Sequence, residues 1–158
     1  MKDSIKVGLG FGVTSGIITT LGLMVGLHSG THSVLAIIGG VLTIAIADAF
    51  SDSLGVHISR EFENKTQKKD IWEATATTFF SKFFMALLFI IPILFFELSL
   101  AVKISIFMGL SLLAIFSYII AKEKKAKPLP IIIKHVSIAT VVIIISQLVG
   151  TLIRSHFV

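Results

Sequence analysis

Asp48 and Asp52 lie four residues apart in an apolar stretch, VLAIIGGVLTIAIADAFSDSLGV, that is otherwise typical of a membrane span. A charged carboxylate in hydrocarbon costs at least about 2.5–3.5 kcal/mol, and residues at i and i+4 share one helix face, where like charges repel. Such a pair is most stable with a metal cation, a proton or a lysine between the carboxylates. Intramembrane carboxylates commonly mark ion or proton paths. The alternative interpretation is a pair of neutral or lysine-paired acids that only hold helices together.

Other polar side chains fall at a similar depth when residues are counted from the expected membrane boundaries. Ser15 in the first span and Lys82 in the third reach the level of the two aspartates. Lys82 is expected either to pair with a carboxylate when the site is empty or to extend to the interface. Hard cations take about six oxygen ligands, so hydroxyls of the first span are needed to complete the shell. The candidate path residues are Thr19, Thr20, Met24 and Lys82.

His57 and Glu61 continue the second helix beyond the membrane and are again separated by four residues. This spacing allows them to share a cation, so they are candidates to receive the ion at the cytoplasmic entrance. The alternative is an ordinary solvated helix end. The candidate metal ligands are therefore Asp48, Asp52, Glu61, Ser15 and His57.

Composition places the chain in a membrane. Of its 158 residues, 54% are hydrophobic and only 15% are charged, against about 25% charged in a typical soluble domain. We expect an all-α, polytopic membrane protein with one domain over residues 1–158. The absence of cysteine excludes disulfides and thiolate metal sites. The formal charge of +5 does not indicate a nucleic-acid partner, because the basic residues cluster between apolar segments.

Five segments are long enough to cross about 30 Å of hydrocarbon: 7–27, 34–56, 74–96, 101–121 and 131–153. Eleven of the fourteen basic residues fall on the N-terminal side of the membrane, Lys65 among them, whereas only Lys103 and Arg154 fall on the other side. By the positive-inside rule, the N-terminus is predicted in the cytoplasm and the C-terminus outside, in an integral protein of the cell membrane.

Glycines recur every four residues in the first span, in two rows that allow close helix packing. One row is Gly8, Gly12 and Gly16, and the other is Gly22, Gly26 and Gly30. The first row is interpreted either as intramolecular packing or as the seam of a homodimer. A two-fold dimer is the commonest symmetric oligomer, and we expect one with the first span near its axis.

Several runs resemble the vacuolar iron transporter family in order. SGIITTLGLMVGLHSG is similar to its first span, IGGVLTIAIADAFSDSLGVHISREFE to its second, and WEATATTFFSKFFMALLFIIPILFF to its third. The resemblance implies a dimeric exporter of iron(II) or manganese, driven by proton exchange. The family's first-span aspartate falls on Ser15, its second-span methionine on Asp48, and a glutamate of some relatives on Asp52. The carboxylates thus lie on the second helix.

Transport of a divalent metal cation is the first functional hypothesis, because oxygen-rich sites suit iron(II) and manganese. The metal is then the transported substrate, with no organic cofactor and no enzymatic activity. One alternative is a magnesium-dependent lipid phosphotransferase, in which Lys82, Arg60 and His57 would clamp phosphate near the run ADAFSDSLG. Another is a structural membrane subunit without transport activity.

Overall fold

The structure is a computed structural model that describes residues 2–63 and 67–157. These residues form helices and contain no strand, which confirms the all-α fold class. Five helical segments are long and apolar enough to span a membrane. The helices are α1 (Asp3–Thr31), α2 (Val34–Glu61), α3 (Lys68–Leu88), α4 (Ile90–Phe95), α5 (Leu98–Glu123) and α6 (Pro128–Phe157).

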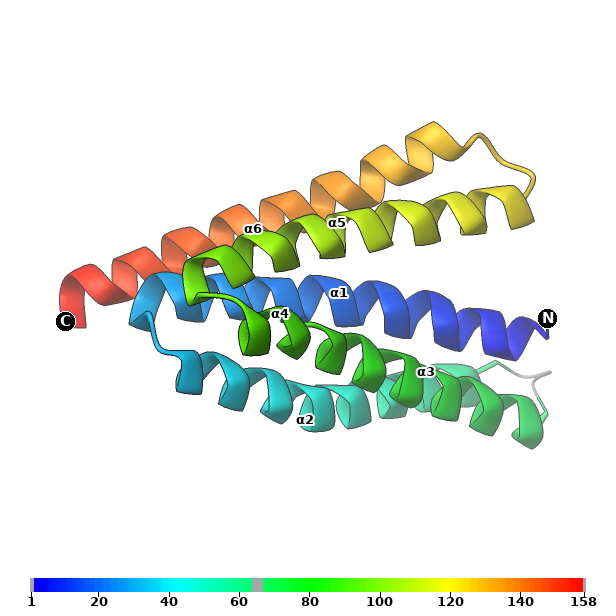
Figure 1. The fold of residues 1–158 in the computed structure, drawn as a ribbon. Helices are drawn as coiled ribbons and strands as arrows, with labels where there is room; N and C mark the ends of the chain where they lie inside the picture. The colour runs from blue at the N-terminus through cyan, green and yellow to red at the C-terminus, as the bar shows by residue number, and fades with distance from the viewer. Residues whose placement is uncertain (1, 64–66, 158) are drawn as a thin grey trace.

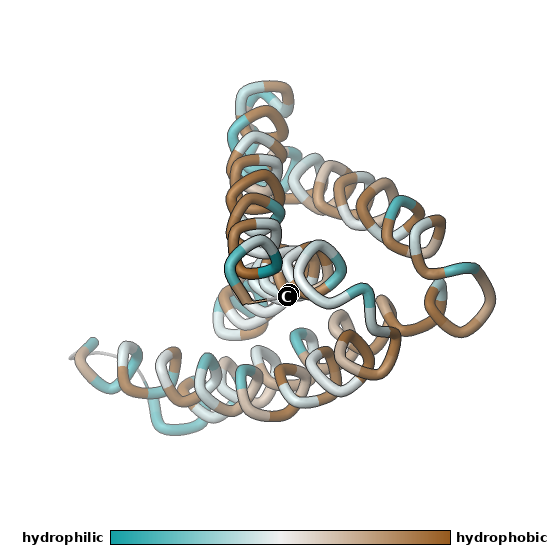
Figure 2. The backbone as a smooth tube through the Cα atoms, turned by 90° about the vertical axis from the view of Figure 1, so that its left-hand side faces the viewer, coloured by the Kyte–Doolittle hydropathy of each residue, from teal (hydrophilic) through white to brown (hydrophobic). Residues whose placement is uncertain are grey.

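Helix α1 lies at the centre of the bundle. It packs against α2, α3, α5 and α6, with α2 and α3 on one side and α5 and α6 on the other (Figures 1 and 2). Within the described residues, α2 and α6 are not packed closely against each other, and neither are α3 and α5. Part of α1 therefore faces open grooves on both sides of the bundle.

The third span is broken into two helices near its C-terminal end. Helix α3 ends at Leu88, and α4 begins at Ile90 and contains Pro92. Proline lacks the N–H that would bond to residue i−4, and its ring clashes with that carbonyl, here Leu88. The continuous 74–96 span predicted from hydropathy is thus two helices, joined at the buried Phe89.

The first glycine row of α1 packs against α3 of the same chain. A Cβ added at Gly8 would lie 2.6 Å from the Ala74 carbonyl oxygen, and one at Gly16 would lie 3.0 Å from the Met85 Cβ. A Cβ at Gly12 would overlap the Ser81 hydroxyl. Because α3 covers this row, a partner helix cannot pack on it without displacing α3. The row is an intramolecular contact rather than the expected dimer seam, and homodimer formation stays a prediction that needs another surface.

The second glycine row packs against α6. Cβ atoms added at Gly26 and Gly30 would lie 3.4 Å from the carbonyl oxygens of Ser146 and Gly150, respectively. In lipid, helices associate through close packing and not through hydrophobic exclusion from water. The two rows therefore fix α3 and α6 against α1 at successive levels of the same helix.

Ion pairs join the helix ends on the N-terminal side. Lys2 Nζ lies 2.7 Å from Glu73 of α3, and Lys6 Nζ lies 2.7 Å from Glu123 of α5. The hydrogen bond to Glu73 raises the pKa of the Lys2 ammonium. The N-terminus and the α5–α6 turn share this end of the bundle, and the C-terminus lies at the other (Figure 1). Termini at opposite ends of the bundle agree with an odd number of spans, here five. Which end is cytoplasmic stays a prediction. Lys65, one of the basic residues used for that prediction, lies outside the described residues.

Candidate functional site

Four polar side chains from three helices meet within the bundle. Lys82 Nζ of α3 lies 2.6 Å from Asp48 Oδ2 of α2 and also forms an ion pair with Asp52 Oδ2. Ser15 of α1 donates a hydrogen bond to Asp52 Oδ2 at 2.7 Å, and Lys82 Nζ donates to the Ser15 hydroxyl at 2.9 Å. The residues expected from depth to share one level thus form one connected cluster, which we call the Lys82 cluster.

The glycine row of α1 positions Lys82. Cβ atoms added at Gly12 and Gly16 would lie 3.2 Å from the Lys82 backbone nitrogen and oxygen, respectively, so a side chain at either position would require α3 to shift. This close approach places the backbone and Cα of Lys82 directly against α1. The residue is only 1% exposed and does not extend to the interface. Of the two orientations expected for Lys82, the structure has the paired one, and it pairs with both aspartates.

The Lys82 cluster carries a net charge of −1 when all three ionisable groups are charged. Its ammonium occupies the position between the carboxylates where the sequence suggested a cation, a proton or a lysine. Adding a divalent cation while Lys82 stays charged and in place would reverse the local charge to +1. Either state leaves one unit charge uncompensated, which is costly in a low-dielectric surrounding, whereas a divalent cation without the Lys82 charge would neutralise the two carboxylates completely.

Two cavities reach the cluster from different directions. Asp48 lines a groove of about 980 Å³ among α1, α2 and α6 that extends to Thr31 at the C-terminal end of α1. Asp52 lines a cavity of about 610 Å³ that reaches Arg60 and Glu63 at the other end of α2. Ser51 lines both cavities. Sequence reasoning missed Ser51, although its position beside Asp52 in the run SDS was the available signal.

The three expected path residues of α1 have different surroundings. Thr19 lines the larger groove, and its hydroxyl donates to the Ser15 carbonyl at 2.9 Å. Thr20 is fully buried, and its hydroxyl has no hydrogen-bond partner among the described residues. Met24 is also fully buried and belongs to the hydrophobic core. The structure therefore brings Thr19 to the candidate path and places Met24 in packing.

His57 and Glu61 lie apart from the Lys82 cluster. His57 lines a third cavity, of about 490 Å³ between α2 and α3, with aromatic walls that include Trp72 and Phe79. The Thr75 hydroxyl donates to the Ile71 carbonyl, so it accepts from His57 Nδ1, 2.9 Å away. The His57 Nε2 atom then faces Glu61 Oε1 at 3.6 Å. This pair can share a proton or cation, but it opens onto a different cavity from Asp52.

Within residues 2–63 and 67–157, no group of three or more histidine, aspartate or glutamate side chains is placed to hold a metal ion. The Lys82 cluster offers two carboxylates and the Ser15 hydroxyl, fewer than the six oxygens that a hard cation takes. Any bound metal would therefore keep several waters.

Fold and site together define an integral membrane protein of five spans with a buried lysine–aspartate cluster between two cavities. Comparison of the chain with protein-family models, curated proteins and solved structures finds no match. The resemblance to the vacuolar iron transporter family accordingly rests on the sequence motifs alone and stays a prediction.

Proposed function

We propose that this protein transports a divalent cation, iron(II) or manganese, out of the cytosol in exchange for protons, with Asp48 and Asp52 as its binding groups. The observation that carries the proposal is the placement of the two carboxylates. Both contact one buried ammonium, yet each lines a different cavity. A cation can thus meet Asp52 from one side of the membrane and leave past Asp48 toward the other.

Charge balance explains the exchange. In the empty site, the Lys82 ammonium neutralises part of the carboxylate charge. A divalent cation that binds both carboxylates neutralises them completely, and Lys82 is then tolerated only as a neutral amine or at another position. In the first case the lysine proton leaves as the cation binds and returns when the cation is released, so one cation movement is coupled to one proton movement in the opposite direction. In the second case the charged lysine moves aside, and the exchanged proton must come from another group.

The ligand set favours a hard or borderline cation. Carboxylate and hydroxyl oxygens suit manganese and iron(II) better than copper(I), and the chain has no cysteine. Ser15 is placed to be a ligand once Lys82 has moved, because its hydroxyl already contacts Asp52. Thr19 and Ser51 line the groove beside Asp48 and can hydrogen-bond waters of a partly hydrated ion.

The phosphotransferase alternative has less support. Such chemistry needs basic side chains that converge on phosphate near the metal. Arg60 instead pairs with Glu63 at 2.6 Å, and His57 bonds to Thr75 in a separate cavity. Of the three basic residues considered for phosphate binding, Lys82 alone contacts the aspartates.

The structural-subunit alternative is favoured by the same ion pairs, which tie α3 to α2 and, through Ser15, to α1. The two functions require different behaviour of the Lys82 cluster. In a structural subunit its ion pairs stay intact, whereas in a transporter they must break so that a divalent cation can replace the Lys82 ammonium.

The test is metal uptake into proteoliposomes that contain a metal-sensitive dye, with a pH gradient imposed across the membrane. Asp48→Asn and Asp52→Asn keep the side-chain shape and remove the charge, and each is expected to lower uptake of iron(II) or manganese at least about tenfold. Asp70→Asn, at a half-exposed position in the first turn of α3, is the matched control. Uptake at the parental rate by both cluster variants would overturn the proposed site.

A further inference from the structure

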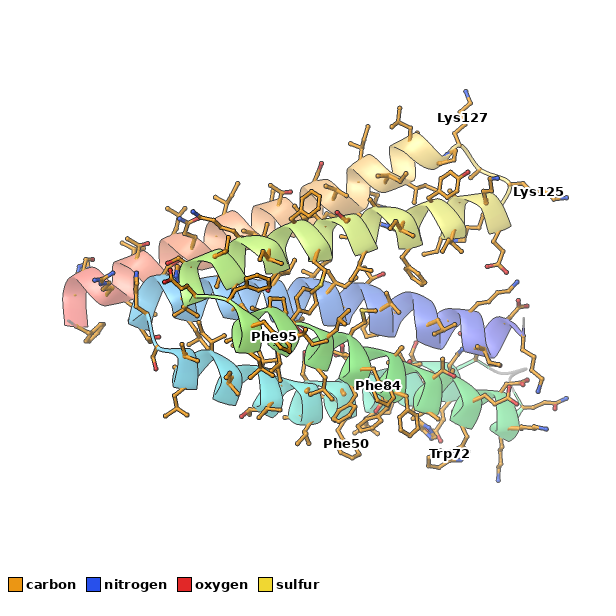
Figure 3. The ribbon with its side chains drawn as sticks, viewed as in Figure 1. Phe50, Trp72, Phe84, Phe95, Lys125 and Lys127 are labelled. Atoms are coloured by element: carbon orange, nitrogen blue, oxygen red, sulfur yellow. The ribbon has the colours of Figure 1, made fainter. Side chains whose placement is uncertain are left out.

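The α5–α6 turn concentrates positive charge beside the membrane. Lys124, Lys125 and Lys127 are exposed, and no ion pair of theirs occurs within the described residues. Lys125 and Lys127 extend away from the ribbon at this end of the bundle (Figure 3). Lys122 lies 5.5 Å from the centre of the Tyr118 ring. Four lysines within six residues at the end of a span are typical of elements that bind anionic lipid headgroups.

An apolar groove leads from this turn into the bilayer-facing surface. The groove lies between α1 and α5, has a volume of about 440 Å³, and is lined by Val7, Leu9, Gly10, Phe116, Ile119 and Ile120. Lys6, Glu123 and Lys124 stand at its rim, together with Asp3. Because α3 and α5 are not packed closely together in the described part of the chain, the groove is not closed by a neighbouring span.

The charges at the rim select the kind of lipid. Lys6 is already paired with Glu123 at 2.7 Å and lies 3.7 Å from Asp3, so its charge is compensated and these three side chains carry a net charge of −1. The lysines of the α5–α6 turn have no such acidic partner within the described residues, so their charge is available to a ligand. Together the rim and turn hold five lysines and two acidic side chains, a net charge of +3. This surface complements a negatively charged headgroup and has no matching preference for a zwitterionic one.

The first turns of α6 form a second exposed apolar surface that begins at the same turn. Leu129 and Ile133 are more than half exposed, and the first buried residue of α6 is Ala139. This apolar segment follows directly after the lysines, so acyl chains can pack against it while the headgroup contacts the charged turn. An amphiphile with an anionic head matches both parts of the surface.

We propose that the groove between α1 and α5 binds an anionic phospholipid, with its headgroup on Lys124 and Lys125 and an acyl chain along Phe116, Ile119 and Gly10. The site is distinct from the Lys82 cluster and does not depend on the proposed transport activity. Lysines near a membrane surface each contribute about 1 kcal/mol to anionic-lipid binding. Removing two of them is therefore expected to weaken the binding roughly ten- to thirtyfold.

The experiment is native mass spectrometry of the full-length protein in detergent, titrated with phosphatidylglycerol or with phosphatidylcholine of the same acyl chains. The parent is expected to retain phosphatidylglycerol preferentially. Lys124→Gln with Lys125→Gln should lose that preference. Lys68→Gln with Lys69→Gln removes the same charge from exposed positions at the start of α3 and should keep it.

A second pair of variants tests the groove itself. A Cβ added at Gly10 or at Gly39 meets no atom within 4 Å, so leucine is accommodated at both positions. Gly10→Leu fills the groove and should reduce retention of both lipids, whereas Gly39→Leu, on α2, should leave retention unchanged. Equal retention of the two lipids by the parent, or equal effects of the two lysine pairs, would overturn the proposal. So would parental retention by Gly10→Leu.

Discussion

The Lys82 Nζ atom on α3 lies 2.6 Å from the Asp48 Oδ2 atom on α2. The same ammonium contacts Asp52 and Ser15, so one cation ties three helices together within the bundle. Breaking a buried ion pair by removing one partner typically costs 3–5 kcal/mol, because the remaining charge is left uncompensated. Lys82 therefore contributes both to the stability of the fold and to the proposed transport site.

Lys82→Met is expected to lower the free energy of unfolding by about 3–5 kcal/mol. Combining it with Asp48→Asn and Asp52→Asn should restore part of that loss, since no uncompensated charge then remains. Denaturant titration in detergent, followed by circular dichroism, measures both effects. Lys103→Met, at an exposed position of α5, is the control, and a Lys82 variant no less stable than that control would contradict the prediction.

Lys82→Gln separates the transport role from the structural one. If the lysine proton is exchanged for the metal, this variant should transport with a weakened dependence on the pH gradient. Proton movement measured with a dye in the same proteoliposomes should fall with it. A variant that keeps the parental ratio of protons to metal would show that the exchanged proton comes from another group.

Gly12→Leu should destabilise the monomer, because its side chain would overlap Ser81 and approach the Thr78 carbonyl oxygen. Overpacking of this kind costs about 1–3 kcal/mol or more. Gly39→Leu, where a Cβ meets no atom within 4 Å, should be nearly neutral. Thermal unfolding measures stability, and light scattering after size-exclusion chromatography measures mass. A stable monomer produced from a parental dimer would restore the dimer-seam interpretation.

Thr20→Val should be neutral or stabilising, because the Thr20 hydroxyl is buried without a partner among the described residues. Replacing an unsatisfied polar group with a methyl group removes a desolvation cost of about 1–3 kcal/mol. Thr78→Val is the contrast, since the Thr78 hydroxyl donates to the Ala74 carbonyl at 2.8 Å. Thermal unfolding of the Thr20→Val and Thr78→Val variants measures the difference in their stability. A Thr20 variant with normal stability but reduced metal uptake would place that hydroxyl on the path.

The predicted orientation can be checked directly because the chain contains no cysteine. In intact cells, Ser155→Cys should react with a membrane-impermeant thiol reagent, and Lys125→Cys should react only after the membrane is opened. Both residues are exposed. Ser155 is near the C-terminus and Lys125 is in the α5–α6 turn, and these two parts of the chain lie at opposite ends of the bundle (Figure 1). Labelling with the reverse pattern would place the N-terminus outside the cell.

Much of this architecture follows from local properties of the sequence. Long apolar runs between charged connectors specify five spanning segments, because hydrocarbon requires every backbone polar group to be bonded within its own helix. Counting residues from the membrane boundaries was enough to bring Ser15, Asp48, Asp52 and Lys82 to one level. The break in the third span was not predicted, although Pro92 was the available signal.

Tertiary structure alone decided which helices are neighbours. Apolar surface does not favour one partner over another in lipid, so the shape of each helix face selects what packs there. The glycines of α1 were compatible with a dimer, but the small Ala74 and the Thr78 and Lys82 backbone of α3 fit that row. The same packing turns Lys82 toward both aspartates and leaves His57 in another cavity, because five residues along a helix rotate the side chain away from Asp52.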